Sequence, residues 1–180
     1  LDGKPLEADL IVMSAGPWLG DLFPRTIRPI SKVVRQDVIY TSTPDGDTSY
    51  DAGNMPCWID HGYGAYGIPS IFGHGVKAAI TWHETEIDLD NDDRIVDQSA
   101  IARSRQYLAY RFPGLVGQRA IDQKACQIAL TPDTHFIIDF HPEHDNVLIA
   151  GGCSGHLFKH GPVFGEYAAG VGLREWGTAP

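Results

Sequence analysis

The chain has 180 residues, 43% of them hydrophobic, which is the length of one domain and enough apolar material for a sizeable core. Its formal net charge of -9 at pH 7 argues against nucleic acid as a partner, because nucleic-acid binding requires a basic surface. No apolar run reaches the length of a membrane span and no secretory leader is visible, so no membrane partner is expected. The three cysteines, Cys57, Cys126 and Cys153, have no paired spacing and indicate reduced thiols in a cytoplasmic protein.

The first predicted element is a short buried strand at residues 10–13, which a Ser-Ala-Gly sequence follows. In dinucleotide-binding folds, ligands lie at the carboxyl ends of such strands. Gly16 and Trp18 would suit that position, and an ordinary strand-to-helix turn explains them equally well. No GxGxxG sequence of the chain follows a strand and opens a helix, as the phosphate-binding sequence of these folds does, and the glycines of residues 151–155 lack its spacing.

The rest of the chain is predicted to form a sheet with two helices. Runs rich in β-branched and aromatic residues predict strands at residues 33–43, 65–69, 76–83, 121–130, 135–140 and 146–150. Asp97 is a suitable N-cap for a helix that ends at Arg111, with Ile101 and Leu108 on its buried face. A second helix is predicted at residues 163–173. Because the strands cluster without strict βα alternation, the predicted fold class is α+β, with a mainly antiparallel sheet flanked by helices.

Four side chains are candidates for chemistry. Cys126 lies within a predicted strand, where a lone cysteine is more often a small buried thiol. Lys159 lies close to a predicted helix N-terminus, an unfavourable place for a cation, and this mismatch favours a functional reason for it. Tyr66 and Lys77 lie in two predicted strands, where a half-buried tyrosine and a solvent-facing lysine would be the ordinary interpretation.

The run from Lys124 to Gly161 combines a cysteine, the block TPDTHFIIDFHPEH, a glycine turn and a lysine. It resembles the flavin-facing segment of the sarcosine oxidase branch of FAD-dependent amine oxidases, which are DAO-type flavoproteins. The resemblance implies that Cys126 is bonded to the flavin ring of FAD, as a thiolate that Lys124 or the flavin itself could stabilise. It also implies that Lys159 binds the carboxylate of the substrate.

The resemblance extends to the segment that contains Tyr66 and Lys77. It implies that Tyr66 lines the substrate pocket and that Lys77 supports the reduction of O2, because a nearby cation stabilises superoxide. It further implies contacts with FAD at Gly16, Trp18, Gly152, Ser154, Gly155, His156 and Lys159. Backbone N–H groups in the glycine turn would stabilise negative charge on the reduced ring.

The chain departs from that family at one position of the pocket. Members usually carry a histidine four residues after the lysine that corresponds to Lys77, and here that position is Thr81. The histidine of this chain is His83, which in a strand would lie on the same face but about 7 Å further along. The role of the family histidine is therefore not transferred, and a different register or a different amine substrate would each account for the change.

A short histidine-rich segment offers residue types that bind zinc, namely His141, Glu143 and His144, with Asp139 nearby. Pro142 prevents the two histidines from sharing one face of a helix, and no HExxH or CxxC sequence occurs in the chain. A hydrogen-bonded turn without a metal is therefore predicted.

The resemblance and the missing phosphate-binding motif between a strand and a helix together predict the C-terminal part of a longer flavoprotein. Residues 1–24 would end the FAD-binding domain, residues 25–145 would form the substrate domain, and residues 146–180 would return to the flavin and form the last helix. The implied activity is the oxidation of a secondary amine or N-methyl amino acid to an imine, with O2 as the acceptor and H2O2 as a product. Two alternatives stay open: a dehydrogenase of the same fold with another electron acceptor, and an inactive fragment or interaction domain.

Overall fold

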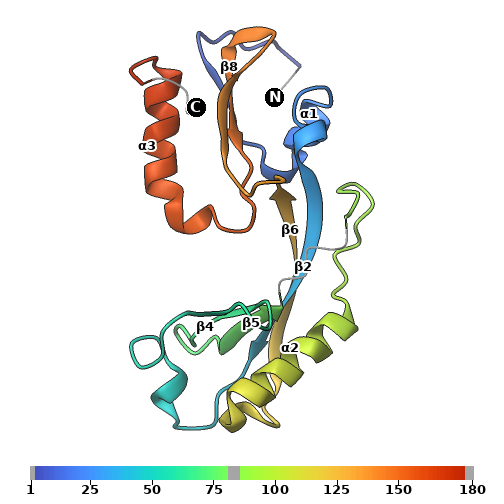
Figure 1. Ribbon diagram of the computed structural model, residues 1–180, viewed down its shortest axis with the longest axis vertical. Coiled ribbons are helices and arrows are strands. Elements are labelled where there is room, and N and C mark those ends of the chain that lie inside the picture. The colour runs from blue at the N-terminus through green and yellow to red at the C-terminus, as the bar shows by residue number, and fades with distance from the viewer. Residues whose placement is uncertain (1–2, 81–85, 177–180) are drawn as a thin grey trace. The chain divides into compact units, whose positions relative to one another are not determined.

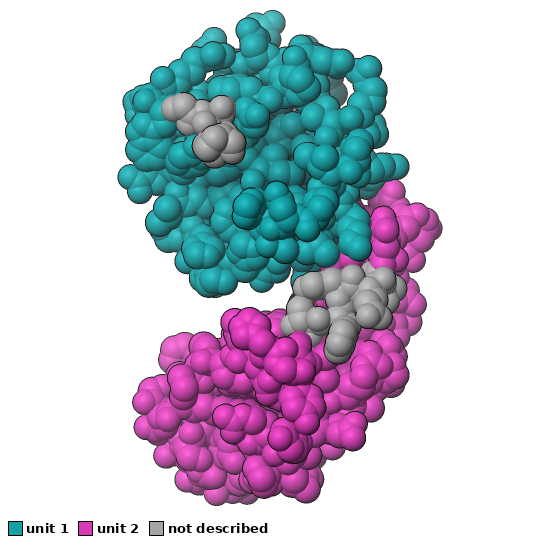
Figure 2. Space-filling model, in the orientation of Figure 1, with its two compact units in different colours: residues 1–33, 128–180 teal, residues 34–127 magenta. Residues whose placement is uncertain are grey.

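The computed structural model describes residues 3–80 and 86–176. The chain forms two compact units, unit 1 with residues 1–33 and 128–180, and unit 2 with residues 34–127 (Figure 2). Each unit has its own apolar core. The chain length predicts one domain, and the structure instead divides these residues between two separately packed units. The assignment of residues 25–145 to a substrate domain stays a prediction.

Unit 1 contains a three-stranded sheet with the order β1-β8-β7 (Figure 1). Its strands are β1 (Ile11–Met13), β7 (Ile137–His141) and β8 (His144–Gly151). The central strand β8 is parallel to β1 and antiparallel to β7. Helix α3 (Gly161–Gly172) packs on this sheet through Ala168 and Val171, which contact Leu148. The short helix α1 (Leu19–Leu22) buries Leu19 against a second cluster that contains Ile149.

Unit 2 contains a five-stranded sheet with the order β3-β4-β5-β2-β6. Its strands are β2 (Lys32–Thr41), β3 (Trp58–Asp60), β4 (Ala65–Ile68), β5 (Val76–Ile80) and β6 (Ala120–Leu130). Helix α2 (Gln98–Arg111) packs on one face, where Ile101 and Leu108 join the core formed with Ile39 and Val76. Short 3-10 helices complete the described chain at Gly16–Trp18, Arg28–Ile30, Thr48–Tyr50, Pro113–Leu115 and Phe158–His160.

The start of α2 shows how local chemistry sets an element boundary. The Asp97 carboxylate accepts a hydrogen bond from the backbone N–H of Ser99, as an N-cap does, which confirms the predicted start. Asp97 is itself held in place, because its own N–H donates to Asp37 of β2 at 2.9 Å. Asp37 also accepts a hydrogen bond from Arg35, whose guanidinium contacts Asp92 at 3.2 Å. This largely buried ion-pair network fixes the segment before α2 to the sheet.

The predicted mixture of helices and a mainly antiparallel sheet is confirmed, as are the strands near residues 10, 33, 65, 121, 135 and 146. The strand predicted at residues 76–83 is present up to Ile80, and its remainder, with Thr81 and His83, lies outside the described residues. The sequence does not predict strand β3 or helix α1, because segments of three and four residues are too short to show a periodic pattern. Among the described residues, no helix has both the length and the apolar composition that a bilayer crossing requires.

Candidate functional site

Tyr66 and Lys77 lie together on the face of the unit 2 sheet opposite α2. The register of β4 and β5 pairs Lys77 with Ile68 and Tyr66 with Ala79. Side chains of paired residues, and of residues two apart in one strand, point to the same side of a sheet. Accordingly, the Lys77 Nζ lies 5.6 Å from the centre of the Tyr66 ring. The structure thus brings these two predicted site residues together.

The orientation of Lys77 is fixed by its neighbours in β5. Val76 and Ala78 are fully buried in the core that contains Ile101 and Leu108 of α2. A register shift of one residue would place the Lys77 ammonium in that core, at a large desolvation cost. The packing of α2 on one face of the sheet therefore determines which side chains lie on the opposite face, which is called the open face below.

The phenol of Tyr66 is held in its neutral form. Burial, together with the smaller effects of the charges of the neighbouring Cys126 and Tyr40, raises the pKa of Tyr66 to about 12. Cys126 of β6 is half-buried and close enough to Tyr66 for this electrostatic effect. Cys126, the third predicted site residue of unit 2, therefore belongs to the same group of side chains as Tyr66 and Lys77. A neutral phenol can donate a hydrogen bond to a ligand over the whole physiological pH range.

Lys124 lies two residues before Cys126 in β6, and its main partner is another residue. Its Nζ lies 3.3 Å from the Asp122 carboxylate, and this hydrogen bond and charge are the first cause of the raised pKa of Lys124. The ammonium also lies 5.5 Å from the centre of the Tyr40 ring. Cys126 has the smallest effect among the causes, so the stabilisation of a Cys126 thiolate by Lys124 stays a prediction.

Tyr40 is a site residue that the sequence did not indicate. It pairs directly with Lys77 in the ladder between β2 and β5. A pocket of about 610 Å³ opens beside it, and its walls include Tyr40, Ile68, His74, Lys77, Ile121 and Lys124. Only the pairing of β2 with β5 places Tyr40 here, and strand pairing cannot be obtained from one strand's own pattern.

The candidate residues of unit 1 lie where two parallel strands end. Met13 at the end of β1 pairs with Ile149 near the end of β8, so both strands end at the same edge of the sheet. Gly16 and Trp18 follow β1 in a 3-10 helix, and the glycine turn follows β8. Ligands of dinucleotide-binding folds lie outside this edge. The two predicted FAD-contacting segments of unit 1 are therefore brought to one edge.

The glycine turn after β8 has a backbone that most residues do not adopt. Gly152 and Gly155 have φ angles of +69° and +76°, and Ser154 between them has φ of +45°. Ser154 is buried, and its hydroxyl accepts a hydrogen bond from the N–H of Thr131 and bonds to the Thr131 hydroxyl at 3.0 Å. The Ser154 side chain therefore holds the turn to the fold, and the strained backbone at this edge is consistent with a binding site.

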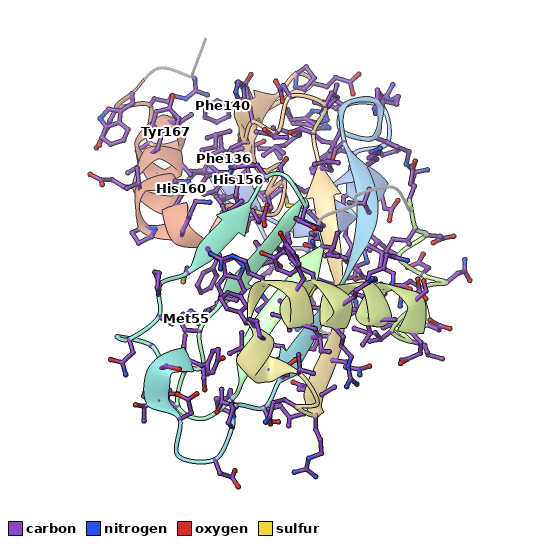
Figure 3. All side chains as sticks on the ribbon, turned by 60° about the horizontal axis from the view of Figure 1, so that its bottom comes forward. Met55, Phe136, Phe140, His156, His160 and Tyr167 are labelled. Atoms are coloured by element: carbon purple, nitrogen blue, oxygen red, sulfur yellow. The ribbon has the colours of Figure 1, made fainter. Side chains whose placement is uncertain are left out.

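His156 and Lys159 follow the glycine turn. The His156 Nε2 lies 2.9 Å from the carbonyl oxygen of Thr134, and its ring centre lies 4.9 Å from that of Phe136. The His160 ring completes this cluster, with its centre 5.9 Å from that of Phe136 and 6.1 Å from that of His156 (Figure 3). Lys159 lies in the 3-10 helix that precedes α3, with its side chain exposed. The ammonium is therefore available to an anionic ligand, while His156 is positioned by the turn of residue 134.

The predicted hydrogen-bonded turn between β7 and β8 is present. The Nδ1 of buried His141 accepts the N–H of Glu143 at 3.1 Å, and its Nε2 lies 3.4 Å from the Thr26 hydroxyl. Glu143 forms an ion pair with Arg25 at 2.8 Å. The ligand atoms of His141, Glu143 and His144 lie within 4.8 Å of one another, so a metal ion would have to displace these bonds.

The residues at the edge of unit 1 fit the flavin cofactor that the resemblance implies. Gly16 has φ of +57° and no atom within 4 Å of the place where a side chain would begin, so its backbone is open to a ligand. At Gly155 the corresponding place is in ordinary contact with Ile128, at 3.7 Å. The chain then begins α3 at Gly161, and helix N-termini favour anionic groups. Small residues and exposed backbone at such an edge suit a planar cofactor with an anionic tail.

The chain belongs to the DAO family of FAD dependent oxidoreductases, since the sequence model of that family matches residues 2–170. Among characterised relatives, monomeric sarcosine oxidase of Bacillus sp. (strain NS-129) is 32% identical over 166 residues, covering 90% of this chain and 43% of that enzyme. Monomeric sarcosine oxidase of Arthrobacter sp. (strain TE1826) is 37% identical over 166 residues, covering 88% of this chain and 42% of that enzyme. The predicted family is thereby confirmed.

A solved structure shows the same fold. Fructosamine oxidase (Amadoriase II) from Aspergillus fumigatus superposes with a TM-score of 0.80 at 19% sequence identity, covering 97% of this chain and 44% of that one. The predicted fold class of a DAO-type flavoprotein is confirmed by this likeness. The chain spans less than half the length of the curated relatives that it matches.

Proposed function

We propose that this chain is the C-terminal catalytic part of an FAD-dependent oxidase that converts a secondary amine, such as an N-methyl amino acid, to an imine. The observation that carries this proposal is the group formed by Tyr66, Lys77 and Cys126 on one open sheet face, within a family match that spans nearly the whole chain. The identity to two monomeric sarcosine oxidases supports the N-methyl amino acid as the substrate class.

In this proposal unit 2 supplies the side chains that meet the reacting groups. FAD, when bound, would supply the chemistry of hydride acceptance from the carbon beside the amine nitrogen and of O2 reduction to H2O2. Lys77 would stabilise the negative charge that develops on oxygen. The neutral phenol of Tyr66 would line the substrate pocket and donate a hydrogen bond.

Unit 1 would hold the cofactor and the carboxylate of the substrate. Gly16 and Trp18 after β1, with Gly152, Ser154, Gly155 and His156 after β8, are the proposed FAD contacts. Lys159 would bind the substrate carboxylate, because an exposed ammonium on a long side chain is a compact charge that can reach such a group. Residues outside this chain would complete the FAD site, since the GxGxxG sequence at residues 62–67 joins β3 to β4 and opens no helix.

The activity is tested on the complete protein that carries this chain, loaded with FAD. Sarcosine and other N-methyl amino acids are added, and H2O2 is measured with a peroxidase-coupled dye. We expect one H2O2 for each amine consumed. Rapid reduction of the flavin by amine with slow reoxidation by O2 would instead identify a dehydrogenase. If none of these amines reduces the flavin, the proposed substrate class is wrong.

The covalent bond between Cys126 and FAD is a separate part of the proposal. Precipitation of the protein in acid releases a flavin that is only non-covalently bound, so the yellow colour should stay in the precipitate of the unmodified protein. Cys126→Ser should lose this colour to the supernatant. Cys57→Ser, which changes an exposed cysteine of unit 2, is the matched control and should keep it. Retention of the colour by Cys126→Ser would place the bond on another residue.

A further inference from the structure

Two exposed tyrosines of unit 2 lie in contact outside the candidate site. Tyr63 lies in the turn between β3 and β4, and Tyr110 lies in the last turn of α2. Their ring centres are 5.2 Å apart with an angle of 38° between the planes. The relative exposures are 47% for Tyr63 and 65% for Tyr110, so solvent reaches both rings. Rings at this distance and tilt are in direct contact.

The two phenols also interact electrostatically. The pKa of the Tyr63 phenol is raised, first by the charge of Tyr110 and then by desolvation and by a hydrogen bond with the Tyr110 side chain. With the ring centres 5.2 Å apart, small rotations of the two side chains bring the carbons next to the phenol oxygens together. Unpaired spin in an oxidised tyrosine concentrates on these carbons and on the oxygen.

The turn that carries Tyr63 is well fixed. Its backbone N–H donates to the Asp60 carboxylate at 3.1 Å, which closes the turn after β3. A pocket of about 420 Å³ lies beside the pair, with walls that include Tyr63, Arg103, Tyr107 and Tyr110. The rings are thus held in place and open to a small reagent.

We propose that Tyr63 and Tyr110 form an oxidative cross-linking site, at which a one-electron oxidant produces an intramolecular dityrosine. Each phenol loses one electron to the oxidant and one proton to water, which leaves two tyrosyl radicals. The radicals join through a carbon–carbon bond between the positions next to the phenol oxygens. The hydrogens at the joined carbons then move to the oxygens, so the net loss is two electrons and two protons. Holding the rings together makes this coupling far faster than coupling between molecules.

Tyr107 is the competing partner, and the structure disfavours it. Its ring centre lies 5.5 Å from that of Tyr63, but it is only 2% exposed. Its hydroxyl donates to Asp60 at 3.4 Å and accepts from the Trp58 indole at 3.2 Å. Tyr107 is therefore much less accessible to the oxidant than Tyr110, and its hydroxyl is already bonded to Asp60 and Trp58. Among the described tyrosine rings, no further pair of tyrosines is in contact.

The test uses the purified protein and a photogenerated ruthenium(III) complex as the one-electron oxidant, with persulfate as the terminal electron acceptor. Proteolysis and mass spectrometry then locate the cross-link. We expect one dityrosine between Tyr63 and Tyr110, with a yield per chain that does not change on dilution. Tyr63→Phe and Tyr110→Phe should each reduce this cross-linked peptide to background. Tyr50→Phe, which removes a tyrosine elsewhere in unit 2, should leave the yield unchanged.

Other outcomes would overturn the proposal. A cross-link between Tyr63 and Tyr107, a product formed only between molecules, or oxidation without any cross-link would each contradict it. Circular dichroism of both phenylalanine variants checks that the fold is retained. The site needs no flavin, so this result is independent of the proposed oxidase activity.

Discussion

The two units use different parts of the polypeptide for their candidate sites. In unit 1, the predicted residues offer mainly backbone: Gly16, Gly152 and Gly155 all have positive φ angles, and the buried Ser154 side chain supports the turn. In unit 2, the predicted residues offer side chains that project from a regular sheet. Backbone at the end of parallel strands suits the holding of a cofactor, whereas projecting side chains suit contact with reacting groups.

This difference predicts that substitutions in the two units have separable effects. A side chain on an open sheet face can be replaced without altering the ladder beneath it, so changes in unit 2 should alter rates and leave cofactor content unchanged. A substitution in the glycine turn must change the backbone itself, so changes in unit 1 should alter folding and cofactor retention.

The largest expected effect follows replacement of Lys77 by methionine, which keeps the length of the side chain and removes its charge. A cation about 5 Å from superoxide contributes about 3 kcal/mol at an effective dielectric constant of about 20, which corresponds to about a hundredfold in rate. Stopped-flow reoxidation of the reduced flavin by O2 should slow by about this factor. Anaerobic reduction by the amine should change little, and FAD content should stay the same.

Lys32→Met provides the matched control for that experiment. Lys32 is an exposed lysine at the start of β2. Its replacement changes the net charge by the same amount and leaves the charge of Lys77 on the open face of unit 2 in place. Equal slowing of reoxidation in both variants would show that overall charge, rather than the position of Lys77, controls the O2 step.

Lys159 is the exception in unit 1, since its proposed role depends on a charged side chain. Lys159→Met should remove a charge-assisted hydrogen bond to the substrate carboxylate, worth about 2 kcal/mol, and raise KM for an N-methyl amino acid about thirtyfold. The matched substrate is the corresponding N-methyl amine without a carboxylate, for which the variant and the unmodified protein should behave alike. A similar rise in KM for both substrates would contradict carboxylate binding.

A smaller effect is expected for Gly152→Ala. The alanine would have φ near +69°, and its Cβ would lie 3.0 Å from the carbonyl oxygen of His135 and 3.1 Å from the backbone nitrogen of Ile137. We expect a loss of about 1.5 kcal/mol in the free energy of unfolding, with weaker retention of FAD. Urea titration and FAD content after gel filtration measure the two effects.

Gly16→Ala separates the two causes of that loss. It imposes the same left-handed backbone but meets no atom within 4 Å, so only the conformational cost applies. A greater loss of stability in Gly16→Ala than in Gly152→Ala would mean that packing against β7 does not contribute.

Much of the fold follows from short-range signals that the sequence contains. Asp97 predicts the start of α2 because N-capping depends on residues two or three apart. The glycine turn and its lysine were identified by resemblance to a family, which carries three-dimensional information that a single pattern lacks. The N-cap at Asp97 and the glycine turn both depend on residues close together in the sequence, and the structure has each of them at the expected position.

Features that depend on pairing between distant segments could not be predicted. The place of Tyr40 beside Lys77 depends on the ladder between β2 and β5, and the support of Ser154 by Thr131 joins residues 23 positions apart. Strand β3 has three residues, too few for an alternating pattern. These features come from tertiary packing, in which the burial of one sheet face selects a register.

The smallest effect at neutral pH is expected for Tyr66→Phe. The pH dependence of its free energy of unfolding tests whether the Tyr66 phenol is buried. The pKa of Tyr66 is about 12 in the folded protein, against about 10 in an unfolded chain. The folded state therefore holds the phenolic proton more tightly, and the resulting stability is fully present below pH 10 and is lost as the pH rises through 12. The free energy of unfolding of the unmodified protein should thus fall more steeply over this range than that of Tyr66→Phe, as urea titrations at successive pH values would show. Tyr167→Phe, in unit 1, is the control, and its free energy of unfolding should fall with pH as steeply as that of the unmodified protein. Identical alkaline slopes for Tyr66→Phe and the unmodified protein would mean that the Tyr66 phenol is solvated, and the open face of unit 2 would then lack the neutral donor proposed for its substrate pocket.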